Sequence, residues 1–278
     1  MSTARIFLSG LIVASMTMAS DVSAQEDQAS IMPGLLSAGG ALDNPDPDLV
    51  LTIGAGASVA PAYFGSEDLE FGPTGLFRFD FVRFPNGFTF GSGRSVGFNE
   101  GFGLRGAARF IGERKAEDHR ELRGLDDIDW TMELGMGIGY EQAQYRFFAD
   151  ARYGFFGHEA FVGQIGADII ARPVDGLTVT FGPRLDLGDD KFMNTYFGVT
   201  PANAAASRYD SYSADGGIVS AGLELTALYQ FDERWGVQGS LEWNRLLDDA
   251  ANSPITQFGD DDQYQLRIQL VRRVSIKF

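Results

Sequence analysis

The sequence contains no cysteine, only two histidines and only ten prolines among its 278 residues. The absence of cysteine excludes a disulfide framework, so strand pairing and burial must supply the stability of the chain. Basic residues are also scarce, with 22 lysines and arginines against 38 acidic residues, and the net charge is −16. Such a surface repels nucleic acid, because nucleic-acid binding depends on basic residues that neutralise phosphates.

Residues 1–24 have the pattern of a secretory signal peptide. The stretch Ile6–Ala19 is apolar but too short to span a bilayer, and Val22–Ala24 is a small-residue cleavage signal. No cysteine follows it, so a lipoprotein anchor is excluded. Residues 25–48 are polar and without periodicity, and we expect a flexible periplasmic segment there. Long apolar runs are missing from 49–278, so this part of the chain can enter a membrane only as a β-barrel.

The end of the sequence alternates between apolar and polar side chains, which predicts a strand with two different faces. One break, at Val271 and Arg272, interrupts the alternation. An amphipathic strand that ends on an aromatic residue is typical of outer-membrane barrels, whose last strand pairs with the first. An ordinary edge strand of a soluble β-protein is the alternative that this segment alone leaves open. We assign barrel closure and the insertion signal to the apolar face, namely Tyr264, Leu266, Ile268, Leu270 and Phe278.

The same alternation recurs from residue 49 onward, most clearly in Trp130–Tyr140. It predicts an all-β protein, a transmembrane antiparallel up-and-down β-barrel with one face toward lipid and one toward the lumen. The segment Pro85–Glu100 leaves the strand count open between ten and twelve, and we favour twelve. The segment Phe192–Val199 fits either a short strand or part of an outer loop.

The connections between the expected strands differ in length. Glu141–Gln144, Arg172–Gly176 and Asp232–Arg234 are short, and barrels of this class keep their short turns in the periplasm. We expect the opposite, outer side to carry the long polar segments 112–128, 187–217 and 246–263.

Residues with catalytic or metal-binding chemistry are few. His119 lies in a run of charged residues that is typical of a solvated loop, and His158 follows a strand end, where a turn residue is expected. Asp260–Asp262 lacks the spacing of a calcium loop, so loop acidity is the better interpretation. No serine stands in a nucleophile motif. We therefore expect no catalytic residue, no cofactor and no metal site.

Charged residues of both signs do occupy the polar phase of the expected strands. In a barrel of this size they either line a narrow water path or neutralise one another in a plugged interior, and we favour the second. The candidate lumen residues are Arg105, Arg109, Glu133, Arg146, Asp150, Arg152, Asp168, Arg184, Asp186, Glu224, Glu242 and Arg267.

The loops carry a family resemblance that runs from about residue 50 to the end. In order, the motifs are Pro61–Asp68, Gly112–Arg114 followed by Leu122–Ile128, Tyr196–Thr200 ahead of Tyr209, and Asn252–Ile255. Together they resemble the MipA/OmpV family of outer-membrane proteins from Gram-negative bacteria. The family pattern has Asp before Ser-Pro-Ile, and Asn252 is a departure from it.

The resemblance implies a non-enzymatic scaffold in the lipid of the outer membrane. Its partners would be a membrane-bound lytic transglycosylase and a bifunctional murein synthase, and no catalytic residues carry over. A small-solute pore is the alternative, motivated by the charged lumen. A membrane-embedded hydrolase ranks third, and it would need a serine or aspartate beside one of the two histidines.

Overall fold

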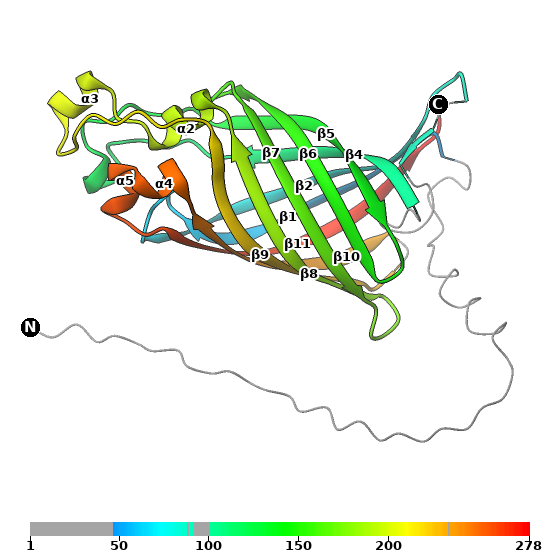
Figure 1. The fold of residues 1–278 in the computed structure, drawn as a ribbon. Helices are drawn as coiled ribbons and strands as arrows, with labels where there is room; N and C mark the ends of the chain where they lie inside the picture. Colours follow the sequence, from blue (N-terminus) through cyan, green and yellow to red (C-terminus); the bar gives the residue numbers. More distant parts are fainter. Residues whose placement is uncertain (1–46, 88, 92–100, 233) are drawn as a thin grey trace, which may run out of the picture.

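A computed structural model describes residues 47–87, 89–91, 101–232 and 234–278 of the chain. The predicted signal peptide and most of the predicted periplasmic segment 25–48 lie outside these ranges. The strands form one antiparallel sheet curved into a barrel (Figure 1). They are β1 Leu49–Pro61, β2 Leu69–Arg83, β3 Thr89–Gly91, β4 Gly101–Ile111, β5 Thr131–Glu141, β6 Tyr145–Phe156, β7 Phe161–Ala171, β8 Leu177–Gly188, β9 Gly217–Gln230, β10 Trp235–Leu246 and β11 Asp262–Ile276.

Every long strand pairs with its neighbour in sequence, and β11 also pairs with β1, as the alternation at the end of the chain predicts. The sheet ends at β3 and β4. There β2 and β4 are in contact, since a Cβ added at Gly106 would lie 3.2 Å from the Cβ of Phe79. The barrel is therefore nearly closed.

The strand count differs from the one that we favoured. The described residues contain ten long strands, the lower of the two predicted counts, and not twelve. The reason lies in the segment Pro85–Glu100, of which the described part adds only the three-residue strand β3. The remainder of that segment lies outside the described residues.

The outer surface of the barrel is apolar, as a transmembrane barrel requires. On β5 the side chains of Leu134, Met136 and Ile138 are exposed, whereas the preceding Glu133 is fully buried in the lumen. Other strands contribute exposed apolar residues to the same belt, among them Phe147, Ile165, Ile169, Leu225, Leu241, Leu266, Ile268 and Leu270.

Aromatic clusters border this belt at both ends. Trp130 lies between Phe110 and Phe156 at one end, with ring centroids 5.9 and 4.5 Å away, and Tyr140 packs on Phe102 at 4.8 Å at the other. The ten residue steps from Trp130 to Tyr140 span about 33 Å along the strand, or about 25 Å at the usual tilt of barrel strands. This height matches the hydrocarbon layer of an outer-membrane bilayer.

The two ends of the barrel differ in the way predicted from the loop lengths. One end, the turn end, carries the connections 142–144, 172–176 and 231–234. The other, the loop end, carries the loops 112–130, 189–216 and 247–261 together with two shorter connections. Short helices fill the loop end: η1 Arg120–Leu122, α2 Asp190–Phe197, α3 Pro201–Ala206, α4 Asp248–Asn252 and α5 Pro254–Gln257.

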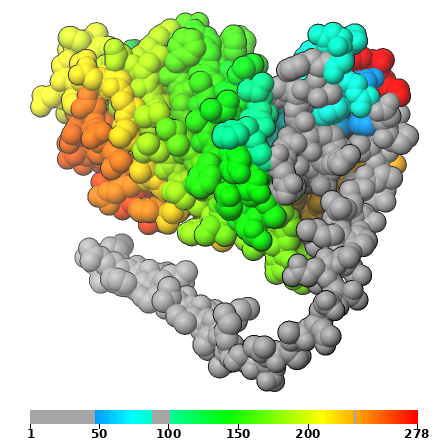
Figure 2. All heavy atoms as spheres, turned by 45° about the vertical axis from the view of Figure 1, so that its right-hand side comes forward, coloured from blue at the N-terminus to red at the C-terminus, as the bar shows by residue number. Residues whose placement is uncertain are grey.

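Helix α2 is the centre of a hydrophobic cap over the loop end. Asp189 caps its N-terminus by accepting a hydrogen bond from the amide of Phe192, 2.8 Å away. The side chains of Phe192, Tyr196 and Phe197 are buried against β7, β9 and α4. Figure 2 shows the helices of the loop end, in yellow and orange, packed on the barrel wall as one continuous surface. The segment Phe192–Val199 is thus part of an outer loop, and that part is mostly helical.

None of the helices in the described ranges is long and apolar enough to cross a membrane.

Candidate functional site

The inward phase of β4 to β11 places the charged residues of the predicted set inside the barrel. They form separate groups and not one continuous network. One of the two larger groups, the Glu133 cluster, consists of Glu133, Arg109, Arg152 and His158. The second, the Asp168 cluster, consists of Asp168, Arg146, Arg184 and Glu224.

In the Glu133 cluster, one fully buried carboxylate accepts hydrogen bonds from two guanidinium groups. Arg109 lies opposite Glu133 in the β4–β5 register and binds both oxygens, at 2.7 and 2.9 Å. Arg152 on β6 donates its Nε to the same carboxylate at 2.9 Å. A bidentate arginine pair of this kind fixes orientation as well as charge.

His158 completes this cluster. It lies in the turn between β6 and β7, as expected, but its ring is fully buried, which the sequence analysis did not predict. The amide of Ala160 donates to Nδ1 at 3.1 Å, so the ring proton is on Nε2, which lies 3.1 Å from Glu133 Oε1. Both ring nitrogens therefore have hydrogen-bond partners within the protein.

Arginines from two strands share the carboxylate of Asp168 on β7. Arg146 Nε and Arg184 Nη2 donate to it at 2.9 and 2.8 Å, and Arg184 also lies 3.4 Å from Glu224. The ring of Phe148 lies beneath both guanidinium groups, with centroid distances of 5.6 and 5.1 Å. Stacking on a ring face adds a cation–π attraction to each ion pair.

The remaining predicted lumen residues are partnered within smaller groups. Arg105 lies 3.1 Å from Asp150 and 4.0 Å from the ring of Phe148. Asp186 accepts hydrogen bonds from Gln164 and Ser220, each at 3.1 Å, and Arg267 pairs with Glu242. A further lumen group near the turn end, Asp80 with Arg78 and Thr52, was not among the predicted residues.

The cap seals the Glu133 cluster from the loop end. Tyr196 of α2 is buried over His158, with ring centroids 5.8 Å apart. Burial raises the pKa of the Tyr196 phenol, so it keeps its proton. Arg114 anchors the same helix by donating to the carbonyl of Tyr196 at 3.2 Å. Helix α2 therefore covers the Glu133 cluster at the loop end.

His119 and the aspartate run lie in loops at this end, as expected. The His119 ring packs edge-on against Tyr63, with ring centroids 5.2 Å apart. Asp260, Asp261 and Asp262 are close enough together to hold a cation. Their oxygens, however, already bind Arg245 at 2.7 and 3.1 Å, the indole of Trp243 at 2.9 Å and the amide of Asp262 at 2.9 Å. These hydrogen bonds with neighbouring residues thus account for the run of three aspartates.

Comparison with solved structures finds barrels of low similarity. Neisserial surface protein A is 10% identical, with 81% of this chain and 97% of that chain covered and a TM-score of 0.28. OprG from Pseudomonas aeruginosa is 11% identical, with 82% and 97% covered and a TM-score of 0.27. The CymD monoaromatic hydrocarbon channel is 10% identical, with 83% and 90% covered and a TM-score of 0.33. Scores at this level carry no argument about function.

Comparison with curated proteins finds no match. The family model described as "MltA-interacting protein MipA", in contrast, matches residues 53–274. The match runs from β1 to β11 and so includes the lumen clusters and every loop of the cap. On this evidence the chain belongs to the MipA family, the family that its loop motifs resemble.

Proposed function

We propose that this protein is a non-enzymatic scaffold in the outer membrane of a Gram-negative bacterium. It binds a lytic transglycosylase and brings it together with a murein synthase. The family match carries this proposal, because the family is described by its interaction with MltA and the match extends over the whole barrel.

The turn end is the side that faces the periplasm in this proposal. Barrels of this class keep short turns in the periplasm and long loops outside. A transglycosylase that acts on the cell wall would meet the turns 142–144, 172–176 and 231–234, while the apolar belt contacts outer-membrane lipid. The engaged ring nitrogens of His158 support a role without catalysis.

The filled interior supports a scaffold over a pore. The carboxylates of the Glu133 and Asp168 clusters are bound by arginines, and α2 covers the loop end. A water path would need room between these groups.

Site-specific photo-crosslinking in cells tests the scaffold. Val174, in the connection between β7 and β8, is 60% exposed, and Phe258 at the loop end is 58% exposed, so they are matched positions. We expect a photoreactive residue at Val174 to yield an adduct that mass spectrometry identifies as a lytic transglycosylase, and the same residue at Phe258 to yield none. If only the photoreactive residue at Phe258 gave adducts with the enzyme, the proposed orientation would be contradicted. If no turn position gave such adducts, the proposed partner would be contradicted.

The alternative function is a small-solute pore, and the charged lumen favours it. Purified barrel in a planar bilayer distinguishes the two. The scaffold predicts little or no steady conductance from the wild-type protein. A large, stable conductance whose ion selectivity shifts toward cations in Arg146→Ala would establish the pore instead.

A further inference from the structure

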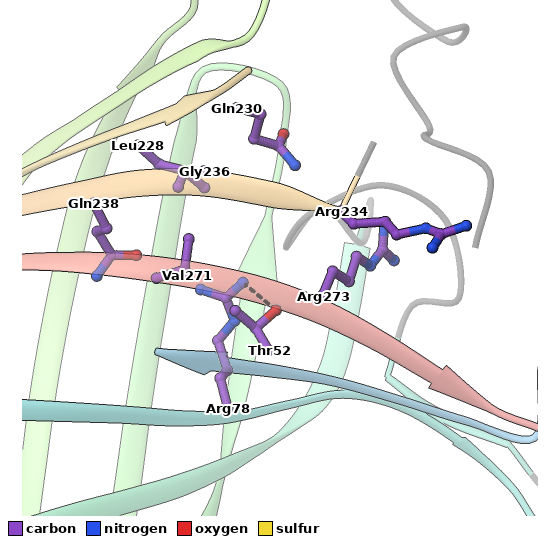
Figure 3. Close-up of a pocket in the computed structure, with 9 residues that line it drawn as sticks. All are labelled: Thr52, Arg78, Leu228, Gln230, Arg234, Gly236, Gln238, Val271 and Arg273. Atoms are coloured by element: carbon purple, nitrogen blue, oxygen red, sulfur yellow. Dashed lines mark hydrogen bonds between the residues drawn. The ribbon is translucent and has the colours of Figure 1, made fainter. Parts of the chain in front are cut away.

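A small pocket lies in the lumen at the turn end, away from the Glu133 and Asp168 clusters. The inward faces of five adjacent strands line it: β2, β1, β11, β10 and β9. Figure 3 shows that its lining is mostly polar. The polar side chains are those of Thr52, Arg78, Gln230, Arg234, Gln238 and Arg273.

Arg273 lines this pocket and differs from other arginines of the lumen in the partners of its side chain. Its side chain is only 5% exposed, yet its Nε and Nη2 have no hydrogen-bond partner among the described residues. The main-chain amide of Arg273 is satisfied by the carbonyl of Arg234 at 2.7 Å, so only the side chain lacks partners. Arg146, Arg152 and Arg184, in contrast, each bind a carboxylate.

The charges around Arg273 do not balance. The nearby lumen carboxylate is Asp80, and it is already engaged by the guanidinium of Arg78 at 2.8 Å and by the hydroxyl of Thr52. Two guanidinium groups thus face one carboxylate. A buried charge without a partner is strongly unfavourable, because the low dielectric interior replaces the water that it has lost.

We propose that this pocket binds one oxyanion group, a carboxylate or a phosphate, that enters from the turn end. An oxyanion accepts hydrogen bonds from guanidinium groups in a charge-assisted geometry. Gln230 and Gln238 add amide donors to the lining of the pocket, Gln238 on the side away from Arg273, and the exposed Arg234 lies near Arg273 (Figure 3). The small volume admits a single acidic group, which is either a free anion or the tip of a larger molecule. The proposal does not depend on which partner the scaffold binds.

Calorimetric titration of the full barrel in neutral detergent tests the site. The probes are inorganic phosphate and acetate at constant ionic strength. We expect saturable binding to the wild type, binding weakened by about tenfold or more in Arg273→Met, and unchanged binding in the matched control Arg245→Met, which removes a charge at the loop end. Equal binding by the wild type and Arg273→Met, or no saturable binding to the wild type, would overturn the proposal.

Two further measurements make the result independent of folding and of the source of the anion. Without anion, Arg273→Met should unfold at the same or a higher temperature than the wild type, because it removes an uncompensated buried charge. If it fails to fold, Gln238→Leu should weaken phosphate binding instead, and unchanged binding in that variant would count against the site.

Phosphate binding that disappears only in phosphatidylglycerol nanodiscs would identify a lipid headgroup as the occupant, whereas binding that persists there indicates a free or partner-borne anion.

Discussion

Glu133 is the residue that holds its cluster together, since Arg109, Arg152 and His158 all bind its carboxylate. We expect Glu133→Gln to lower the free energy of unfolding by about 3–5 kcal/mol, because the buried guanidinium of Arg152 and the half-buried one of Arg109 lose their counter-charge. Urea unfolding in micelles measures this. The control Glu159→Gln removes the exposed partner of Lys191 and should cost no more than about 1 kcal/mol. Equal effects of the two substitutions would mean that the cluster is not structurally important.

Tyr63 gives the loop end a dependence on alkaline pH. Burial and the carboxylate of Glu121, 3.2 Å from its hydroxyl, raise the pKa of this phenol above its usual value. An acid whose folded pKa is raised contributes stability that is complete below its unfolded pKa of about 10 and is lost as the pH rises toward the folded pKa. The stability lost between about pH 8 and about pH 11 should therefore be smaller in Tyr63→Phe than in the wild type. An identical loss of stability in both proteins would exclude Tyr63 as a source of the pH dependence.

The sequence and its alternation indicate which residues are charged and which face of a strand they occupy. They do not indicate which charges pair, because a pair such as Arg109 and Glu133 depends on the register between two strands. The burial of His158 could not be predicted for a related reason. A single histidine after Phe156-Gly157 carries no signal of burial, and only the folded cap places Phe192 over it, with ring centroids 5.2 Å apart.

At the scale of elements, β1 and β11 approach so closely that one glycine is required between them. A Cβ at Gly56 would lie 1.9 Å from the carbonyl oxygen of Ile268, whereas one at Gly75 of β2 would meet nothing closer than 3.8 Å. Gly56→Ala should therefore lower the free energy of unfolding by about 1–3 kcal/mol, and Gly75→Ala should have little effect. Heat-modifiability on SDS gels, followed by urea unfolding, compares the two. Equal stability of both variants would show that the strands can separate without cost.

The last strand supplies a second prediction at this scale. The amide of Phe278 donates to Asp48 at 3.0 Å, which ties the end of β11 to the start of β1. Phe278→Ala keeps this main-chain hydrogen bond but removes the aromatic side chain to which we assign the insertion signal. We therefore expect the substitution to lower the amount of protein inserted in the outer membrane, as quantified by fractionation and immunoblotting. Insertion at the wild-type level would contradict the role assigned to this residue.

Helix α2 is an element for which the sequence leaves helix and strand both open. Phe192, Met193, Tyr196 and Phe197 have helical spacing behind the N-cap residue Asp189, but a short apolar run also fits a strand. Only its packing on α4 and on the strands decides between the two, and that packing joins loops far apart in the chain.

At the scale of the whole molecule, the orientation of the barrel predicts where proteases reach it. Trypsin added to intact cells should cut at the loop end, for example after the exposed Arg123, and should spare Arg172 in the turn 172–176. Permeabilised cells, in which both ends are accessible, serve as the control. Cleavage after Arg172 alone in intact cells would reverse the orientation.

The cap also determines what an antibody can recognise. Its buried core joins α2 to Ala250 of α4 and Ile128 of the first long loop, and a second core joins Leu122 to Ile255. The surface above these cores is therefore a discontinuous epitope, assembled from segments that are distant in sequence. Antisera raised against single loop peptides would recognise the denatured chain better than the native barrel, so immunisation aimed at the native surface would need the folded protein.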